Sequence, residues 1–250
     1  MTSEHYTVTR ANDRLSITLD RPSVSNAFPE ASVVSLTETI RDIEQGDATT
    51  VVIDARGDQF SVGADIHDLN PDTPDDARSL SDTYADLVAS IRECPLPVIV
   101  SVQGRAFGFG FLLALGGDFV VADSRATFAV PEARLGIPIS GYAIELLPQL
   151  IGERRARDWL FTGRDIPATE AHNAGFVTRL ADKADLTEVT AKLVTAVERS
   201  SSDTLAILKD RLSDPAIGAE TQSLRTAAAD AMEYAFTDGD ARERLEELRQ

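Results

Sequence analysis

Two short glycine-containing turns are the features of this 250-residue sequence that point most directly to chemistry. The first turn, Phe60–Ile66, follows an apolar run at Thr50–Asp54, and the second, Gly104–Phe111, follows another at Pro97–Val102. Backbone N–H groups are free where such turns enter helices, and the helix dipole favours negative charge there. Two turns on neighbouring strands can direct two N–H groups at one oxygen, which is the geometry of an oxyanion hole. Glycines more often serve tight packing, so spacing alone leaves both interpretations open.

Other reaction centres have little support in the sequence. The glycines at 104, 108 and 110 do not follow the order of a dinucleotide-binding turn, and no phosphate-binding Gly-Lys-Ser/Thr follows them. Three scattered histidines and one cysteine, Cys94, give no metal-ligand spacing and no internal disulfide. Ser61 and Ser140 have no evident histidine partner, and a G-x-S-x-G elbow is absent from the sequence. We therefore expect no metal, no cofactor and no serine-hydrolase centre.

Composition limits the partners and the cellular location that can be expected for the protein. The formal net charge is −17, from 41 acidic and 24 basic residues, and such a surface repels nucleic-acid backbones. The sequence has no apolar run of membrane-spanning length, so no membrane partner is expected. The N-terminal residues lack a signal-peptide pattern, so we expect a cytoplasmic protein. A hydrophobic fraction of 43% is enough for one large core.

The patterning predicts an α/β core followed by helices. Alternating residues at Tyr6–Thr9 and Leu15–Leu19, with a turn at Asn12-Asp13, predict a hairpin. A helix opened by Pro29 and a buried strand at Thr50–Asp54 follow, and a strand-helix-strand order favours a parallel sheet. Further strands are expected over residues 97–102 and 118–122, and helices over 74–93, 109–116, 142–150, 153–161, 185–199, 202–212, 219–236 and 240–249.

A series of motifs in order along the chain carries a family resemblance. They are Leu19-Asp20-Arg21-Pro22 with Asn26-Ala27, FSVGADI at 60–66, the stretch 101–122, FAVPEARLGI from Phe128, and GERRARDWLFTGRDIPATEAHNAGFV at 152–177. Together they resemble the enoyl-CoA hydratase/isomerase (crotonase) family over residues 5 to 180. The resemblance implies a spiral of ββα units at 1–180 and a helical trimerisation region at 181–250. It also implies a coenzyme A thioester as substrate and a homotrimer or homohexamer as assembly.

The resemblance also assigns roles to residues of this chain. The N–H groups of Ala64 and Phe109 would hold the thioester oxygen, and Glu132 would be the acid or base. The ring of Phe109, at a position where the family usually has glycine, is expected to narrow the acyl pocket. Arg21 is the candidate for contact with the phosphates or adenine of CoA. The other expected substrate neighbours share these motifs: Ala27, Gly63, Asp65, Ile66, Gly108, Leu112, Ser140 and Tyr142.

One departure from the family pattern bears on the reaction. The family's hydratases use two glutamates, and the first of these positions is Leu112 here. Moving a double bond needs only one base, so the resemblance favours an isomerase acting through a dienolate, in acyl-CoA and fatty acid metabolism. A hydratase (a lyase) or an acyl-CoA hydrolase or decarboxylase would need Ser140, Tyr142 or Glu145 as the missing group. An acyl-CoA-binding protein with little catalysis is the third alternative.

Overall fold

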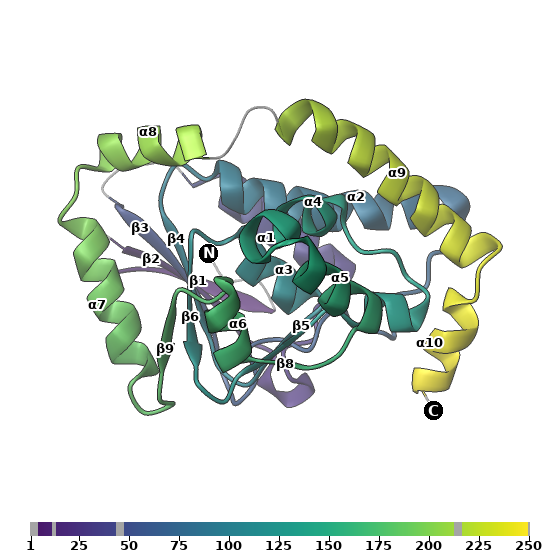
Figure 1. The fold of residues 1–250 in the computed structure, drawn as a ribbon, viewed down its shortest axis with the longest axis horizontal. Helices are drawn as coiled ribbons and strands as arrows, with labels where there is room; N and C mark the ends of the chain where they lie inside the picture. The colour runs from purple at the N-terminus through teal and green to yellow at the C-terminus, as the bar shows by residue number, and fades with distance from the viewer. Residues whose placement is uncertain (1–4, 12–13, 44–47, 213–216, 250) are drawn as a thin grey trace.

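The computed structural model describes residues 5–11, 14–43, 48–212 and 217–249 (Figure 1). The strands β1 (Tyr6–Ala11) and β2 (Arg14–Leu19) pair antiparallel, which confirms the expected hairpin. The turn predicted at Asn12-Asp13 lies outside the described residues.

A mostly parallel sheet of six strands forms the centre of the molecule. After β2 come β3 (Thr50–Ala55), β4 (Val98–Val102), β6 (Phe119–Asp123) and β9 (Arg179–Ala181). The order is β1-β2-β3-β4-β6-β9, and every pair after the hairpin is parallel. Strand β4 is buried along its whole length, in keeping with its continuous apolar sequence.

Helices cover both faces of this sheet (Figure 1). Helices α1 (Glu30–Arg41), α2 (Pro74–Glu93) and α3 (Phe109–Gly116) pack on one face and enclose the main hydrophobic core. Helix α7 (Leu186–Glu198) covers the other face, where its Leu193 and Val194 meet Ile99 and Val121 of the sheet. The carboxyl ends of the strands therefore lead into turns that α2 and α3 border.

A second, three-stranded sheet was not expected from the sequence. Its strands are β5 (Arg105–Phe107), β7 (Thr127–Ala129) and β8 (Ile166–Pro167), with β5 and β7 parallel and β8 antiparallel to β7. These strands have two or three residues each, too few for a periodic pattern to reveal them. The sheet fixes the second glycine turn against the segment that precedes Glu132.

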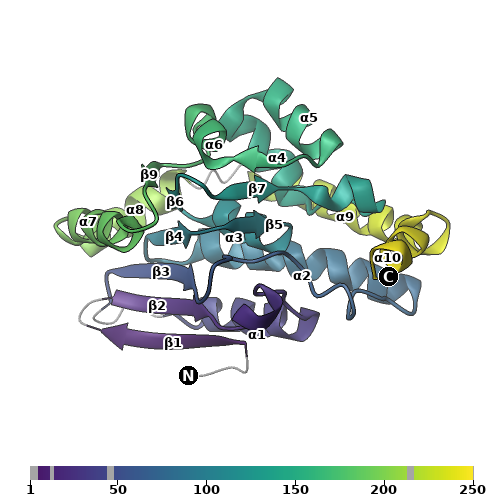
Figure 2. The ribbon, with the colours of Figure 1, turned by 90° about the horizontal axis from the view of Figure 1, so that it is seen from below.

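The C-terminal part is helical, as predicted, apart from the short strands β8 and β9. Its elements are α4 (Gly141–Ile151), α5 (Glu153–Thr162), α6 (Ala168–Ala174), α8 (Ser202–Leu212), α9 (Ile217–Thr237) and α10 (Ala241–Arg249). Two short 3-10 helices, η1 (Pro22–Val24) and η2 (Pro131–Leu135), precede them. Figure 2 shows α9 lying along α2, with α10 at its end. There Met232, Phe236 and Leu245 form a second apolar cluster with Leu69 and Leu80.

Helix α8 is tied to the strand ends by a buried ion pair. Lys209, only 8% exposed, donates to Asp118 Oδ2 at 2.7 Å and to the carbonyls of Ile91 and Leu96. The same Asp118 oxygen accepts the Val98 N–H at 2.7 Å. Every partner in this cluster is satisfied within the protein, so its role is structural.

Candidate active site

The two glycine turns meet side by side. Ser61 accepts the Phe107 N–H and donates its own to the Arg105 carbonyl, both at 2.9 Å. A Cβ placed on Gly108 would lie 3.7 Å from Gly63 Cα, and both glycines have positive φ, +49° and +115°. This close approach and this backbone conformation explain why glycine stands at both positions.

The N–H groups of Ala64 and Phe109 lie at the ends of these turns. Phe28 donates to the Gly63 carbonyl and accepts from the Asp65 N–H, so the N–H of Ala64, between them, faces away from Phe28. Phe109 is the first residue of α3, where the helix offers its N–H no acceptor. Neither N–H has a hydrogen-bond acceptor within the described residues. Both residues line one cavity, so its wall includes two residues whose backbone donors have no acceptor in the described part of the chain.

The side chain of Phe109 differs in part from the expectation. Its ring is stacked on that of Phe28, with the centroids 4.7 Å apart and the planes at 17°, and the residue is 2% exposed. Much of the ring therefore fills the core under α3, because two apolar faces are removed from water there. Residue 109 still forms part of the cavity wall, but the core takes up much of the ring that was expected to narrow the pocket.

The cavity has a volume of about 420 Å³ and mostly apolar walls. Its apolar lining comes from the turns, α2, the η2 region and the two C-terminal helices: Val62, Ile66, Leu69, Leu80, Phe107, Phe109, Leu112, Leu135, Ile137, Ile139, Met232 and Leu248. Polar side chains interrupt this lining: the Glu132 carboxyl, the Tyr84 phenol, the hydroxyls of Ser81 and Ser140, and the guanidinium-bearing side chain of Arg134. A cavity of this size and composition suits a small organic ligand held by a few polar contacts.

Glu132 has a buried carboxyl group with a raised pKa, a property common among catalytic acids and bases. It lies in η2, and its Oε1 is 3.0 Å from where a Cβ on Gly108 would stand. The residue is partly exposed as a whole, but Oε2 is buried and has no hydrogen-bond partner among the described residues. Burial without a partner raises the pKa of Glu132 to about 7, against a smaller lowering by a backbone hydrogen bond. A carboxyl group with this pKa can both accept and return a proton near neutrality.

Leu112 lies in the same cavity, at the position where the family's hydratases have a second carboxylate. It is 3% exposed and packs with the core side of α3. No other Asp or Glu is among the described residues that line the cavity. Glu132 is thus the one carboxylate that these walls present to a ligand.

Some of the other expected substrate neighbours line the cavity, and others lie outside it. Gly63, Ile66, Gly108, Leu112 and Ser140 line it. Arg21, Ala27 and Asp65 do not; they form a cluster in which Arg21 Nη1 donates to the Ala27 carbonyl at 2.6 Å and to Asp65 Oδ2 at 3.2 Å. Arg21 therefore has internal partners, and its contact with CoA stays a prediction.

Tyr142, expected near the substrate, is not among the residues that line the cavity. It is buried in the first turn of α4, and this burial is the main cause that raises the pKa of its phenol. The charge of Glu93 raises the pKa further, whereas Arg225 and Arg92 lower it. Those charged residues belong to the end of α2 and to α9, so Tyr142 faces that junction. Its neighbour Ser140 lies on the cavity side of the same helix start.

Sequence reasoning missed the contributions of α2 and of the two last helices. Tyr84 and Ser81 line the cavity from α2, Met232 from α9 and Leu248 from α10. The helical spacing of α2 did indicate an inward face through Leu80 and Tyr84. The spacing alone cannot show that this face of α2 borders a cavity as well as the hydrophobic core.

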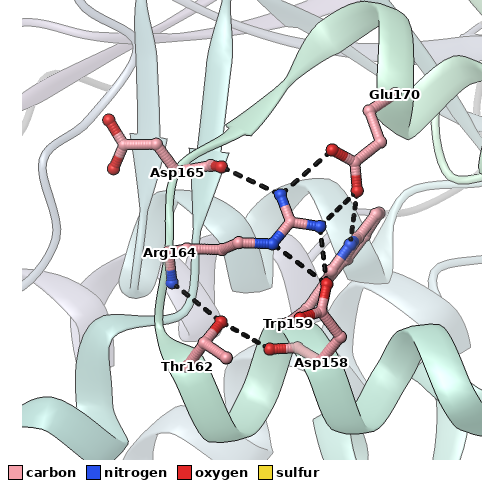
Figure 3. A network of polar contacts seen from close by, with 6 residues as sticks. All are labelled: Asp158, Trp159, Thr162, Arg164, Asp165 and Glu170. Atoms are coloured by element: carbon pink, nitrogen blue, oxygen red, sulfur yellow. Dashed lines mark hydrogen bonds and ion pairs between the residues drawn. The ribbon is translucent and has the colours of Figure 1, made fainter.

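A polar network lies at the C-terminal end of α5, and its residues are drawn in Figure 3. Arg164 donates to Asp158 Oδ2 and to both carboxylate oxygens of Glu170, at 2.5 to 3.0 Å, and Trp159 Nε1 also donates to Glu170. These donors lower the pKa of Glu170, the Arg164 hydrogen bond most. The network joins the C-terminal end of α5 to α6.

The end of α5 in turn contacts the Glu132 turn. A Cβ on Gly163 would come within 3.1 Å of Pro131 Cα, and Arg134 Nη1 donates to the Gly163 carbonyl at 3.3 Å. The network therefore fixes the surface on which Pro131 and Arg134 rest, on either side of Glu132. Its members hold one another and leave the Glu132 carboxyl untouched.

Two further properties concern the described part of the chain only. No group of three or more His, Cys, Asp or Glu side chains suited to holding a metal ion occurs among the described residues. Within the same residues, none of the helices combines the length and the apolar character required to span a bilayer.

Comparison with known proteins relates this chain to a family. The family model described as enoyl-CoA hydratase/isomerase matches residues 10–248. A 1,2-epoxyphenylacetyl-CoA isomerase of Escherichia coli K12 is 30% identical over 217 residues, covering 85% of this chain and 81% of the relative. A carnitinyl-CoA dehydratase of Salmonella enteritidis PT4 is 33% identical over 210 residues, covering 83% and 80%.

Solved structures agree in fold. An enoyl-CoA hydratase from Mycobacterium avium subsp. paratuberculosis K-10 superposes with a TM-score of 0.88 at 22% identity, over 98% of this chain and 99% of that one. A putative enoyl-CoA hydratase from Thermobifida fusca YX, solved in complex with CoA, gives a TM-score of 0.78 at 24% identity, over 90% and 92%. The family match and the shared crotonase-like fold together show that this chain belongs to the enoyl-CoA hydratase/isomerase family.

Proposed function

We propose that this protein is an enoyl-CoA isomerase that moves a double bond along the acyl chain of a CoA thioester with Glu132 as its single base. The observation that carries the proposal is the Glu132 carboxyl, whose buried Oε2 has no hydrogen-bond partner among the described residues. In that part of the chain no second carboxylate lines the cavity, and the N–H groups of Ala64 and Phe109, which also line it, have no acceptor. A reaction that removes and returns one proton needs no more than this.

The mechanism follows from where charge develops. The thioester oxygen is held by the N–H groups of Ala64 and Phe109, and Glu132 takes a proton from C2 of a 3-enoyl thioester. The electron pair of the broken C–H bond moves into a dienolate whose negative oxygen is stabilised by both donors, each worth roughly 10² to 10³ in rate. Glu132 then returns the proton to C4, which leaves the double bond between C2 and C3. The cycle is balanced without a cofactor or a metal.

The apolar walls contribute to the same step. They exclude water, so the carboxyl of Glu132 is poorly solvated and its pKa lies near 7 rather than near its ordinary value of 4.5. At neutral pH a substantial fraction of the protein then holds the basic carboxylate, and the conjugate acid is strong enough to give the proton back.

A direct assay tests the proposal. Incubation with 3-hexenoyl-CoA should produce the conjugated 2-enoyl thioester, followed by its ultraviolet absorbance, and Glu132→Gln should abolish most of the turnover. Unchanged turnover in that variant would contradict the mechanism. Binding of a thioester panel without any turnover would instead support an acyl-CoA-binding protein.

A second candidate, hydration of an enoyl-CoA, is favoured by one observation. Ser140 lines the cavity, and its buried Oγ has no hydrogen-bond partner among the described residues, so this hydroxyl is the candidate for the second polar group that hydration requires. One of the two relatives described above is named an isomerase and the other a dehydratase, so the relatives do not favour either reaction. Crotonyl-CoA in ¹⁸O-labelled water separates them, because label at C3 appears only if water is added.

A further inference from the structure

The C-terminal helix α10 contacts both of the turns that carry the proposed reaction. On one side it meets the residues that follow Ala64, and on the other side it meets the turn that contains Glu132. The proton transfer assigned to Glu132 gives α10 no task, and of the described residues of this helix only Leu248 lines the cavity. The contacts of α10 with the two turns therefore need an explanation of their own.

Arg249 joins α10 to the segment that follows Ala64. Its guanidinium donates from Nε and Nη2 to the Ile66 carbonyl, at 2.9 and 2.6 Å, and from Nη2 to the Leu69 carbonyl at 3.2 Å. Neither carbonyl accepts a backbone hydrogen bond within the described residues, because this stretch forms no helix or strand. A planar guanidinium that serves two such acceptors holds the backbone between them in one arrangement.

Arg242 extends this attachment along the same segment. Its Nη1 donates to Asn70 Oδ1 at 2.9 Å, its Nη2 donates to the Pro71 carbonyl, and its Nε donates to the Phe236 carbonyl of α9 at 2.9 Å. The two arginines are seven positions apart in the sequence, which is about two helical turns, so both leave the same face of α10. The segment 66–71 is therefore bound to this face at both of its ends.

The other attachment of α10 is to the turn that contains Glu132. Gly136 ends η2 with a φ of +69°, and a Cβ placed on it would lie 3.4 Å from the Ala241 backbone at the start of α10. Arg244 adds a hydrogen bond to the Arg134 carbonyl at 3.3 Å. Close-packed elements transmit displacement to one another, so the position of α10 limits where this turn can lie.

Leu245 lies between the two attachments. It is 1% exposed and belongs to one apolar cluster with Leu69 and Ile137, and Ala64 packs against that cluster. Leu69 follows the Ala64 turn, whereas the N–H of Ile137 donates to the Glu132 carbonyl at 2.9 Å. One buried cluster therefore joins both turns through α10.

We infer that α10 positions the proposed active site, with Arg249 as its main positioning residue, by fixing the turn that carries the Ala64 N–H against the turn that carries Glu132. The inference rests on the proposed function in one respect, that these two groups act on the same thioester. A displacement of about 1 Å between groups that act together can cost roughly 10² in rate, so a residue remote from the chemistry can limit turnover. Arg249 itself does not line the cavity.

Turnover and ligand affinity, measured separately, test the inference. Arg249→Met keeps the aliphatic stem and removes the donors, so kcat for 3-hexenoyl-CoA should fall about 10- to 100-fold, while the Kd of the unreactive hexanoyl-CoA should change by less than about threefold. Arg249→Lys can still donate to one carbonyl and should recover part of the loss. Arg157→Met, the same change at an exposed arginine paired with Glu153 of its own helix, should keep the wild-type kcat.

Amide hydrogen exchange tests the same claim without catalysis. Because one helix joins both turns, Arg249→Met should speed exchange about tenfold or more in residues 64–71 and also in residues 131–137. Strand β3 should keep its protection, which shows that the variant is folded. If Arg249→Met loses the protection of β3, the milder Arg249→Lys decides the question, with the same two segments expected to respond together.

Several results would overturn the inference. A wild-type kcat in Arg249→Met, or unchanged exchange in residues 131–137, would show that α10 does not hold the two turns together. A weaker Kd for hexanoyl-CoA at unchanged kcat would make Arg249 a ligand contact instead. Failure of the proposed function has a different outcome: the wild type would not isomerise 3-hexenoyl-CoA, while exchange in both turns would still rise together in the variant and support the positioning role of α10.

Discussion

Two glutamates of adjacent segments, Glu132 and Glu170, show how differently one side chain behaves in two regions of the molecule. Glu170 accepts hydrogen bonds from Arg164 and Trp159, and its pKa is lowered (Figure 3). Glu132 has a buried oxygen without a hydrogen-bond partner in the part of the chain that the structure describes, and its pKa is raised to about 7. The difference lies in the partners that the surrounding chain provides.

Glu170 is thus the carboxylate that stabilises the fold, and Glu132 is the one available for chemistry. A partnered carboxylate lowers the free energy of the folded state and has no reason to take a proton. A desolvated carboxylate without partners raises the free energy of the ionised folded state, and this same property makes it a base near neutral pH. We therefore expect substitutions of the two glutamates to have opposite consequences.

The largest expected effect is on turnover. Glu132→Gln should lower kcat by about 10² to 10⁴, the usual contribution of a general base, while Glu170→Gln should retain activity within about threefold. Steady-state assays with 3-hexenoyl-CoA measure both variants under the same conditions. Comparable losses in the two variants would remove the functional distinction between them.

Phe109→Pro tests the backbone N–H of residue 109, which is proposed to hold the thioester oxygen while Glu132 moves the proton. Proline removes this N–H and is tolerated at the first position of a helix. We expect kcat/KM to fall roughly 10² to 10³-fold. Phe109→Leu, which keeps the N–H and loses the stacked ring, is the matched control for packing against Phe28. A leucine variant as impaired as the proline variant would assign the loss to packing.

The pH dependence of kcat/KM should report the raised pKa of Glu132 directly. The base must be ionised, so activity should rise with pH up to about 7 and fall about tenfold for each unit below it. Glu170→Gln should leave this limb in place, since the pKa of Glu170 is lowered and it stays ionised throughout. An acidic limb that begins near pH 4.5 would mean that the essential base is an ordinary, solvated carboxylate.

Stability should respond in the opposite direction to activity. Because the folded-state pKa of Glu132 is raised above 4.5, the folded protein binds this proton more tightly than the unfolded chain, and stability is lost as pH rises through that interval. At pH 8, Glu132→Gln should therefore increase the free energy of unfolding by about 1–3 kcal/mol, an increase that fades below pH 5. Urea denaturation at both pH values measures it, and a variant less stable than the wild type at pH 8 would contradict the sign.

The smallest effect expected is that of Glu170→Gln on stability. It removes the charged acceptor of a half-exposed network, for which solvent screening limits the loss to about 1–2 kcal/mol. A shift of the urea midpoint at unchanged slope would show it. If the variant were as stable as the wild type, the network would not be a support of the α5–α6 segment.

The main elements of the fold were predictable from sequence because they are long and periodic. Helix α2 begins and ends at the predicted residues, 74 and 93, and the capping bonds between Thr73 and Asp76 explain where it begins. The hairpin and the buried strands β3 and β4 were equally visible. The strands β5, β7, β8 and β9 were not, since two or three residues make no pattern and long-range pairing decides their state.

The site was predictable as far as it consists of local turns. Ala64, Phe109 and Glu132 follow from ordered motifs, and the structure brings all three to one cavity. Tyr84 and Met232 come to the same cavity through the packing of α2 and α9, which no local pattern records. Burial of the Glu132 carboxyl is likewise a property of the assembled walls, so its raised pKa was beyond the reach of motif spacing.

The central role of Glu132 depends on where its carboxyl ionises, and this can be measured on the protein itself. Difference infrared spectroscopy of the wild type against Glu132→Gln isolates the carbonyl stretch of this one protonated carboxyl across a pH titration. We expect a band that disappears with a midpoint at about pH 7. A midpoint near 4.5 would show that the carboxyl is solvated and that the cavity does not prepare it for proton transfer.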